Sequence, residues 1–189
     1  MKIILATHNI HKRDELSKLL SGNFDVEVLP SDFPEIEETG STLEENARIK
    51  AGTVYEALRL PTLADDTGLE VEALGGAPGV YTARYAGENA IYNDNCIKLL
   101  QELEGKSNRN ALFKTTLCFI DTDGTEQLFT GIVAGEIAIE ARGSNGFGYD
   151  PVFIPDGSGG RTFAELSAEE KNIMSHRARA IQIFLDSLS

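Results

Sequence analysis

The chain has 189 residues, of which 41% are hydrophobic and 25% are charged, a composition typical of one ordinary globular domain with a sizeable core. Its 30 acidic residues outnumber its 17 basic ones, giving a formal net charge of -13. This charge argues against binding of duplex nucleic acid or of an anionic membrane, because both partners need a basic face. A small phosphorylated ligand remains compatible with it, since a pocket can be basic locally on an acidic surface.

The two cysteines, Cys96 and Cys118, lie in apolar runs and do not make a disulfide framework. We therefore expect both to be reduced core residues of a cytoplasmic protein. The N-terminus, MKIILATHN, has too short an apolar run for a signal peptide, and no segment approaches membrane-spanning length. The expectation is a single domain over residues 1–189.

The first sixty residues predict strands that alternate with helices. Short apolar runs rich in β-branched residues favour strands, and apolar residues spaced three or four apart favour helices. Thr42 and Glu45 form a capping box, which marks the start of a helix. The expected elements are a buried strand at 3–6, a polar loop at 7–12, a helix with Leu16, Leu19 and Leu20 on one face, a strand at 24–29, a loop up to Gly40, and a helix with the stripe Leu43, Ala47, Ala51, Val54 and Leu58.

The remainder of the chain mixes strands and helices without an internal repeat or a linker. Two short strands are expected to flank the sequence LADDTG at 63–68. This pattern predicts an α/β domain with a mixed sheet. The other expected elements are a loop at 75–79, a helix at 91–103, long strands at 112–120 and 127–139 joined by a turn at 121–124, an irregular segment at 143–160 with a short strand at 152–154, and a last helix that begins after the capping box of Ser167 and Glu170 and carries the stripe Ile173, Ile181, Phe184, Leu185 and Leu188.

Two pairs of adjacent carboxylates stand near expected loops, Glu37 with Glu38 and Asp65 with Asp66. Adjacent like charges are costly unless a cation, a proton or water compensates them. Such oxygen ligands suit Mg²⁺, which usually also retains waters and phosphate oxygens. The pattern therefore indicates metal-dependent phosphate chemistry. The cations that could complement a polyphosphate are Lys12, Lys50, Lys171, His176 and Arg177.

The polar sequence THNIHK at 7–12 follows the first expected strand and precedes the first expected helix. Free backbone N–H groups and the helix dipole make such a position an anion site, and Lys12 adds a point charge suited to phosphate. The P-loop pattern is absent, and an ordinary polar turn remains the alternative. Zinc binding by His8 and His11 would need a third ligand, and none follows at a useful spacing.

The sequence FIDTDGT at 119–125 copies the aspartyl-nucleophile motif of haloacid-dehalogenase-type phosphatases. Those enzymes place the motif on their first strand, however, and only 64 residues follow Thr125 here. The same residues are favourable in a hairpin turn, which is the interpretation that we prefer. A dinucleotide-binding fold is not supported either, because no G-x-G-x-x-G opens a helix after the first strand.

Five blocks of sequence, from Ala6 to Ala180, resemble those of the inosine/xanthosine triphosphate pyrophosphatases. Enzymes of this family hydrolyse deaminated purine nucleoside triphosphates to the monophosphate and pyrophosphate. The resemblance implies a Mg²⁺-dependent hydrolase of this class, usually a homodimer, in which an elongated mixed sheet with flanking helices forms two lobes around a nucleotide cleft. The blocks are ATHNIHK, EETGSTLEENARIKA, LADDTGLEVEALGGAPGVYTARYAG, GFGYDP and EEKNIMSHRARA.

The resemblance also implies a role for each matching residue. Asp66 would be the catalytic carboxylate and, with Glu38, a ligand of Mg²⁺. Lys50 would reach the phosphates, and Thr67 would touch the substrate beside Asp66. The triphosphate would be held by Thr7, His8, Asn9, Ile10, His11 and Lys12. The base pocket would be formed by Phe147, Gly148, Tyr149, Asp150, Lys171, His176 and Arg177, with Phe147 stacked on the purine and the last two reading its 6-oxo edge.

Asp65 and Asp66 are expected to have different roles, because successive side chains of an extended segment point to opposite faces. Asp66 would face the nucleotide and orient or deprotonate the water that attacks the α-phosphorus in line. Asp65 would face away and cap backbone donors or hold the loop, while Thr67 and Gly68 turn the chain out of the site. Fixed positive charge from the lysines would supply the larger part of catalysis.

Two other functions remain open from the sequence. A related nucleotide pyrophosphatase with a pyrimidine or other modified-nucleotide preference would share these motifs, and a panel of substrates would distinguish it. A non-catalytic nucleotide sensor would keep the pocket but lack the catalytic carboxylate, whereas Asp66 is present.

Overall fold

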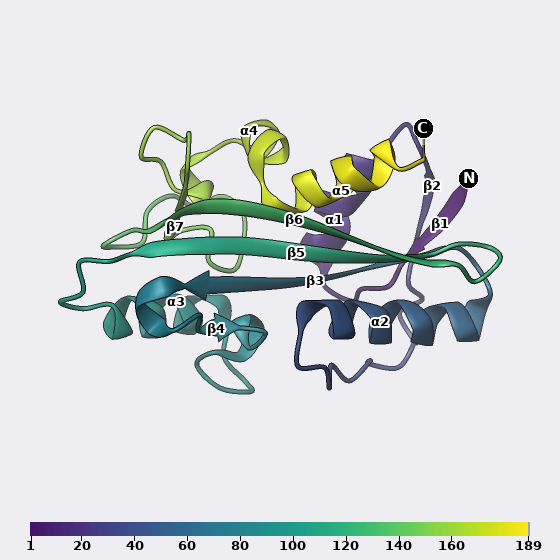
Figure 1. Cartoon of the computed structure of the whole chain (residues 1–189), viewed down its shortest axis with the longest axis horizontal. Coiled ribbons are helices and arrows are strands. Elements are labelled where there is room, and N and C mark those ends of the chain that lie inside the picture. Colours follow the sequence, from purple (N-terminus) through teal and green to yellow (C-terminus); the bar gives the residue numbers. More distant parts are fainter. Residues whose placement is uncertain (189) are drawn as a thin grey trace. The chain divides into compact units, whose positions relative to one another are not determined.

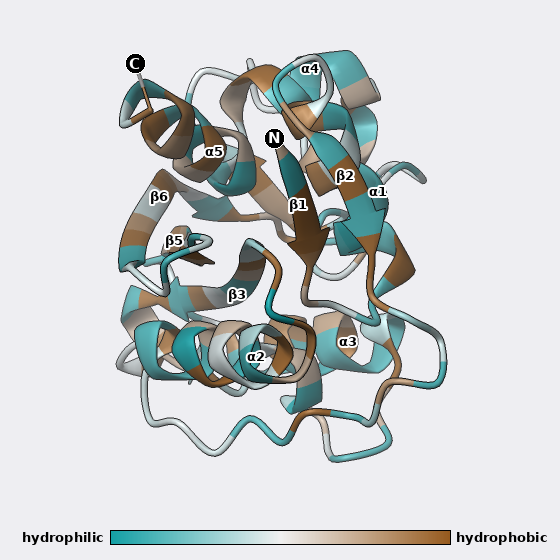
Figure 2. Ribbon diagram, turned by 90° about the vertical axis from the view of Figure 1, so that its right-hand side faces the viewer, coloured by the Kyte–Doolittle hydropathy of each residue, from teal (hydrophilic) through white to brown (hydrophobic). Residues whose placement is uncertain are grey.

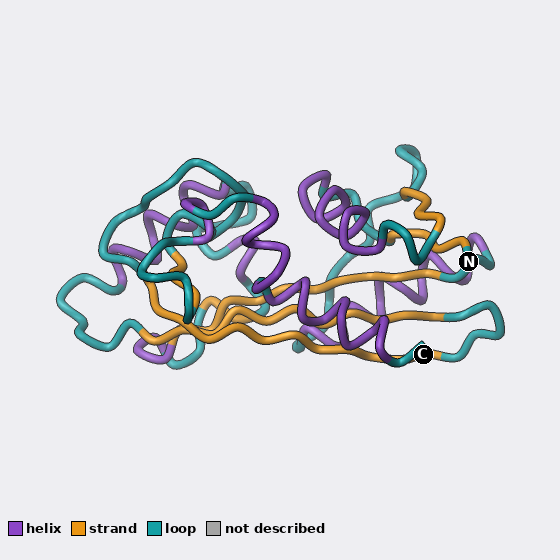
Figure 3. Tube along the Cα trace, turned by 90° about the horizontal axis from the view of Figure 1, so that it is seen from above, coloured by secondary structure: helices purple, strands orange, loops and turns teal. Residues whose placement is uncertain are grey.

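The structure is a computed structural model that describes residues 1–188, so the last residue of the expected domain, 189, lies outside the described residues. The chain contains both helices and strands (Figures 1 and 3), which confirms the predicted α/β class. The α-helices within 1–188 are α1 (Ile10–Leu20), α2 (Leu43–Leu58), α3 (Tyr92–Glu102), α4 (Ala168–Met174) and α5 (His176–Asp186). Short 3₁₀ turns are formed by Glu72–Leu74, Thr82–Arg84 and Phe163–Glu165.

The strands form one mixed sheet with the hydrogen-bonded order β2-β1-β3-β5-β6-β7, and β4 pairs with β3. The strand β1 is parallel to both β2 and β3, whereas β3 with β4 and β6 with β7 are antiparallel. This arrangement confirms the predicted mixed sheet. The strands are β1 (Lys2–Leu5), β2 (Asp25–Val28), β3 (Thr62–Val71), β4 (Pro78–Gly79), β5 (Asn110–Ile120), β6 (Glu126–Ile137) and β7 (Phe153–Pro155).

The chain divides into two compact units, and each has its own hydrophobic core. The first unit comprises Met1–Asp66, Thr115–Gly131 and the chain from Arg177 onward, and the second comprises Thr67–Lys114 and Ile132–His176. The boundary falls inside strands rather than in a linker, since β3 leaves the first unit between Asp66 and Thr67.

In the first unit, alternate side chains of the strands pack against helices on opposite faces of the sheet. Ile3 and Leu5 of β1 belong to a core cluster that includes residues of α1 and α5, whereas Ile4 belongs to a cluster with residues of α2. Figure 1 shows α2 on one side of the strands with α1 and α5 on the other, and Figure 2 shows β1 as a largely hydrophobic strand. This two-sided burial explains why the strand is apolar at successive positions.

The core of the second unit is built around aromatic rings. The ring of Phe113 in β5 lies 5.1 Å from that of Phe153 in β7, at an interplanar angle of 79°. The ring of Phe163 lies 5.3 Å from Phe153, and the cluster also contains Leu99 of α3. Edge-on and tilted pairs of this kind are favoured by the quadrupoles of the rings.

The sequence LADDTG lies inside one continuous strand, so the prediction of two short flanking strands with a turn at Thr67 and Gly68 was wrong. The strand β3 runs from Thr62 to Val71, and its second half pairs with β4 through Leu69 and Gly79. Two adjacent carboxylates do not end the strand here, because cationic side chains from other elements compensate both of them.

Two further boundaries differ from the predictions. The polar loop ends at Asn9 rather than at Lys12, because the Asn9 side chain caps α1 and brings positions 10–12 into the helix. The predicted last helix is two helices, since Ser175 takes extended backbone angles (φ -67°, ψ 157°) and ends α4. Ile173 therefore leaves the predicted apolar stripe, and its side chain is 82% exposed.

Three local signals in the sequence are confirmed. Thr42 caps α2 by accepting a hydrogen bond from the Glu45 N–H at 3.1 Å, whereas the Glu45 carboxylate accepts the Ser41 N–H at 2.6 Å. Ser167 caps α4 in a complete capping box with Glu170. The motif at 121–124 is the turn between β5 and β6, in which the Gly124 N–H donates to the Asp121 carbonyl, as the turn interpretation requires. No helix among the described residues is both long and apolar enough to cross a membrane.

Both cysteines are buried free thiols, as predicted, and we expect them to resist alkylation in the native protein. Burial raises the pKa of both Cys96 and Cys118 to about 12, so almost no thiolate exists at neutral pH. Iodoacetamide at about pH 8 should modify neither thiol until urea unfolds the chain, which mass spectrometry of the intact protein measures. Rapid labelling of either cysteine in the folded protein would contradict this prediction.

Candidate functional site

The loop between β1 and α1 is an internally bonded turn that carries Lys12 on its first helical turn. The Thr7 hydroxyl oxygen accepts the Asn9 N–H at 3.2 Å, and Asn9 Oδ1 accepts the N–H groups of His11 and Lys12 at 3.0 and 3.2 Å. These three N–H groups already have acceptors within the loop. The Asn9 oxygen therefore caps α1, a role that the sequence analysis did not predict for this residue.

Asp65 is fully buried in the first unit and is compensated by two cations. Its Oδ2 lies 3.3 Å from Lys12 Nζ and 3.1 Å from Arg177 Nη2, and Arg177 Nη1 donates to Glu15 Oε2 at 2.5 Å. Arg177 itself is only 1% exposed. The side chain opposite Asp66 on β3, which the sequence predicted to cap backbone donors or to hold the loop, thus pairs with charged groups of α1 and α5.

The charges around Asp65 keep it ionised. Burial alone raises the pKa of its carboxyl, but Lys12, Arg177 and Lys50 outweigh that effect and hold the pKa well below its usual range. The guanidinium of Arg177 shows the reciprocal effect, because Asp65 and Glu15 raise its pKa despite burial. At neutral pH these residues therefore form a charged network in the interior.

Asp66 projects from the opposite face of β3 into a second charged cluster of the first unit, which we call the Asp66 cluster (Asp66, Lys50 and Glu38). Lys50 of α2 donates to Asp66 Oδ1 at 3.1 Å and to Glu38 Oε1 at 2.6 Å. Asp66 is 5% exposed and Lys50 is 7% exposed. The predicted opposite orientation of the two aspartates is confirmed by their different partners.

The electrostatics of the Asp66 cluster differ from those around Asp65. Burial raises the pKa of Asp66, Glu38 raises it further, and Lys50 and Lys12 only partly oppose them. Burial lowers the pKa of Lys50, but Asp66, Glu38 and Asp65 outweigh it, so the ammonium stays charged. A carboxylate with a raised pKa beside a fixed cation is suited to exchange a proton with water.

The Asp66 cluster fits a Mg²⁺ ion in its ligand chemistry. Glu38 and Asp66 both place carboxylate oxygens within 3.1 Å of the same atom, Lys50 Nζ, so the two groups converge on one place. Mg²⁺ commonly takes one or two carboxylates and completes its shell with water and phosphate oxygens. Within residues 1–188, no three or more His, Cys, Asp or Glu side chains are grouped to hold a metal ion. Glu37 is exposed.

The GFGYD segment of the second unit is a tight turn organised by Asp150. Asp150 Oδ2 accepts the Phe147 N–H at 2.8 Å and lies 2.5 Å from Lys171 Nζ. Gly146 has a φ of 74°, and a Cβ added there would lie 1.9 Å from Asp150 Oδ2, so this position requires glycine. The Tyr149 hydroxyl donates to the Thr82 carbonyl at 2.9 Å and anchors the end of the turn.

Phe147, the predicted purine-stacking residue, lies in a partly exposed aromatic and cationic setting. The Lys171 ammonium lies 5.0 Å from the centre of its ring, and the Tyr92 ring lies 5.8 Å away at 47°. One turn along α3, the Cys96 thiol donates to the Gly148 carbonyl at 3.3 Å. These contacts hold the turn from the side of α3.

The other predicted site residues differ in their burial. His176 is 3% exposed and its imidazole is stacked on the Phe113 ring at 4.2 Å, as a buried core residue of the second unit. Thr67 is half-buried in β3 directly after Asp66. Among the segment at 7–12, His8, Ile10 and His11 are exposed.

Sequence reasoning missed Asn46 and Glu15, which contact predicted site residues. Asn46 is 2% exposed and donates from Nδ2 to Asp66 Oδ2 at 3.2 Å. The available signal was its position one helical turn before Lys50, which places both on one face of α2. Glu15, one turn after His11 on α1, gave no comparable signal.

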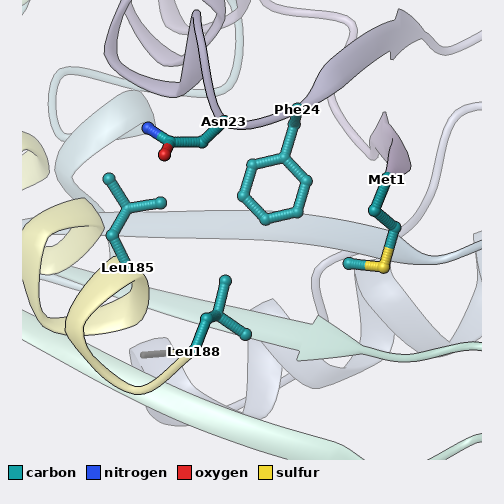
Figure 4. A pocket seen from close by; sticks show the side chains of 5 residues that line it. All are labelled: Met1, Asn23, Phe24, Leu185 and Leu188. Carbon is teal, nitrogen blue, oxygen red and sulfur yellow. The ribbon is translucent and has the colours of Figure 1, made fainter.

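The first unit also contains an open pocket of about 350 Å³. Figure 4 shows its lining side chains, which come from Met1, from the two residues before β2, and from the end of α5 and the turn after it. None of these residues belongs to the predicted site, so the assignment of the site is unchanged. The lining residues are Met1, Asn23, Phe24, Leu185 and Leu188.

Comparison with known proteins places this chain in a family. The model of the Ham1 family matches residues 3–187. A protein of Thermoanaerobacter sp. (strain X514) named dITP/XTP pyrophosphatase is 50% identical over 187 residues, which cover 96% of this chain and 93% of that protein. A protein of Flavobacterium johnsoniae with the same name is 44% identical over 191 residues, covering 100% and 98%.

Solved structures of Ham1 proteins have the same fold as this chain. The HAM1 protein from Coxiella burnetii superposes with a TM-score of 0.88 at 42% identity, covering 100% of this chain and 98% of that one. The Staphylococcus aureus Ham1 protein superposes with a TM-score of 0.87 at 40% identity, covering 100% of both chains. The fold is therefore shared along the length of the chain.

Proposed function

The chain belongs to the Ham1 family, and from this we propose that it hydrolyses deaminated purine nucleoside triphosphates, namely ITP, dITP and XTP, to the monophosphate and pyrophosphate. The observation that carries the proposal is the Asp66 cluster, a buried carboxylate, ammonium and second carboxylate in a chain 50% identical to a protein named dITP/XTP pyrophosphatase. Its role in the cell is to remove damaged nucleotides from the pool.

In the first unit, the proposed roles concern the triphosphate. Lys12 and Lys50 supply fixed positive charge to phosphate oxygens, which is the main contribution that a protein makes to phosphoryl chemistry. Asp66 orients a water for in-line attack on the α-phosphorus and accepts its proton, a role favoured by its raised pKa. The loop at 7–12 contacts the phosphates beside Lys12.

We propose Mg²⁺ as the cofactor, held by Glu38 and Asp66. When bound, the ion neutralises the triphosphate and stabilises the charge that develops on the departing pyrophosphate. Glu38 and Asp66 would hold the ion, and Lys50, which donates to both carboxylates, would supply positive charge beside it.

In the second unit, the proposed roles concern the base. Phe147 stacks on the purine while Asp150 fixes its backbone and Lys171 lies over its ring. A donor aimed at O6 accepts inosine and xanthosine but meets the amino group of adenine donor to donor. An unpaired buried donor costs roughly 1–3 kcal/mol, so one such clash discriminates about 5- to 150-fold. His176 of the second unit is a proposed donor, and the resemblance assigns the same role to Arg177, which belongs to the first unit; both are buried.

The acidic surface supports a small-molecule substrate rather than a nucleic acid or a membrane. The resemblance supports a cytoplasmic homodimer. A nucleotide pyrophosphatase with a pyrimidine or modified-nucleotide preference is the alternative, and the names of the curated relatives favour the purine substrates instead.

A substrate panel tests the proposed function. With Mg²⁺ and detection of pyrophosphate, ITP, dITP and XTP should give a far higher kcat/KM than ATP, GTP and dTTP. The same reactions assayed for orthophosphate serve as the control for an ordinary phosphatase. Orthophosphate as the primary product, or faster turnover of dTTP, would contradict the proposal.

Removal of the stacking ring should weaken substrate binding. Phe147→Ala is expected to raise KM for ITP about 5- to 150-fold with a smaller change in kcat, because stacking of a base on an aromatic ring contributes about 1–3 kcal/mol. Phe147→Tyr is the matched control, since it keeps the ring and should keep KM within about threefold of wild type. An unchanged KM in Phe147→Ala would remove Phe147 from the base site.

A further inference from the structure

Asn46 contacts the proposed catalytic carboxylate on the side away from Lys50. It lies on α2 one turn before Lys50, and its side chain is buried. Asn46 Nδ2 donates to Asp66 Oδ2 at 3.2 Å, while Lys50 Nζ donates to Asp66 Oδ1 at 3.1 Å. Two residues on one face of the same helix therefore hold the two oxygens of the carboxylate separately.

The orientation of the Asn46 amide is determined by its second partner. Asn46 Oδ1 accepts the Gly40 N–H at 2.8 Å. Rotating the amide by half a turn would place its NH₂ against the Gly40 N–H and its oxygen against the Asp66 carboxylate, and both contacts would become repulsive. The amide is thereby fixed with its donor toward Asp66.

Gly40 allows this arrangement because it has no side chain. A Cβ at Gly40 would lie 2.6 Å from Asn46 Oδ1 and 2.7 Å from Glu45 Cβ, both closer than real contacts allow. The loop can approach α2 only with glycine at this position. Glu38 stands two residues earlier in the same loop, so the bond between Gly40 and Asn46 also determines how close Glu38 comes to Lys50.

We propose that Asn46 is a positioning residue for hydrolysis. Its amide holds the Asp66 carboxylate in one orientation and ties to it the loop that carries Glu38, so that both carboxylates keep their relative geometry during turnover. A neutral donor does this without adding charge to the Asp66 cluster, whereas a second cation would compete with Lys50. This inference rests on the proposed function, since it assigns Asn46 a part in the same reaction.

The inference predicts that Asn46 variants lose kcat without losing nucleotide binding. Asn46→Ala should lower kcat for ITP by about 10- to 100-fold, because a misplacement of about 1 Å in a reacting group can cost that much. KM, and the Kd of a non-hydrolysable imido analogue of ITP measured by calorimetry, should stay within about threefold of wild type. Asn46→Asp keeps the shape but replaces the donor with an acceptor, and it should not restore kcat.

A matched control separates positioning from stability. Asn95 of α3 is also buried, at 1% exposed, and its amide makes two bonds as well, accepting the Ala86 N–H at 2.7 Å and donating to the Ala83 carbonyl at 3.0 Å. Asn95→Ala should lower Tm about as much as Asn46→Ala. Its kcat for ITP should remain within about threefold of wild type.

The outcomes distinguish the inference from the function on which it rests. A kcat of Asn46→Ala within threefold of wild type, or an equal loss of kcat in Asn95→Ala, would overturn the role of Asn46 and leave the proposed function intact. If Asn46→Ala does not fold, the nearly isosteric Asn46→Asp decides, and wild-type kcat in that variant would overturn the inference. A wild-type protein that hydrolyses none of the nucleotides in the panel would overturn both.

Discussion

Replacement of Asp66 by asparagine is expected to lower kcat for ITP by about 10²- to 10⁴-fold, the range that a general base contributes. The variant keeps the size of the side chain but cannot accept a proton from water. KM should change little, because Lys12 and Lys50 remain to bind the triphosphate. Steady-state kinetics with pyrophosphate detection measures both constants.

The stability of this variant serves as its control. The raised pKa of Asp66 means that folding disfavours its ionised form relative to the unfolded chain, mainly because the carboxylate is buried. A neutral amide removes this penalty but also removes a carboxylate partner of buried Lys50, which keeps Glu38, so Tm should change little. A variant that keeps near-wild-type kcat would remove Asp66 from the chemistry, and a large fall in Tm would show that the loss of activity reflects unfolding.

Removal of Asp65 should have the largest effect on stability. Asp65→Ala leaves the Arg177 guanidinium, 1% exposed, without one of its two carboxylate partners and leaves Lys12 without Asp65. Breaking a buried ion pair by deleting one partner typically costs about 3–5 kcal/mol, because an uncompensated charge stays buried. The free energy of unfolding, measured by urea titration, should fall by about that amount.

An exposed ion pair provides the comparison. Lys2 and Glu27 lie 2.7 Å apart with side chains 48% and 42% exposed, so water already solvates both charges. Glu27→Ala should therefore change the free energy of unfolding far less than Asp65→Ala. Equal effects of the two substitutions would show that the buried network around Asp65 does not stabilise the fold.

Elements whose signals are local were predictable from the sequence. The starts of α2 and α4 follow from capping residues within one turn of the helix, and the turn at 121–124 follows from its own Asp and Gly residues. The long strands β5 and β6 follow from apolar runs flanking that turn. In each case the residues that determine the structure are neighbours in the sequence.

Features that depend on distant residues were not predictable in the same way. The strand β3 continues through Asp65 because Arg177, 112 positions later, offers a buried guanidinium to it. Asn46 was overlooked because an apolar stripe is identified from hydrophobic residues alone. A buried amide on the same helix face cannot be told from a solvent-facing residue by this pattern. The break at Ser175 has no glycine or proline to mark it.

In the candidate site, too, some features were predictable from the sequence and others were not. The sequence analysis named Lys50 and Glu38, the two charged partners in the Asp66 cluster. Lys50 Nζ lies 2.6 Å from Glu38 Oε1 and 3.1 Å from Asp66 Oδ1. What the sequence did not provide was the pairing of Lys12 and Arg177 with Asp65. Pairings between charges depend on the packed geometry, because many cations and carboxylates in one chain could satisfy one another.

Hydrolysis of ITP in water enriched in oxygen-18, with mass spectrometry of both products, tests the central claim most directly. Attack of an Asp66-activated water on the α-phosphorus predicts that the monophosphate carries the heavy oxygen and that the pyrophosphate carries none. Label in the pyrophosphate, or labelled orthophosphate released with a nucleoside diphosphate, would contradict the account.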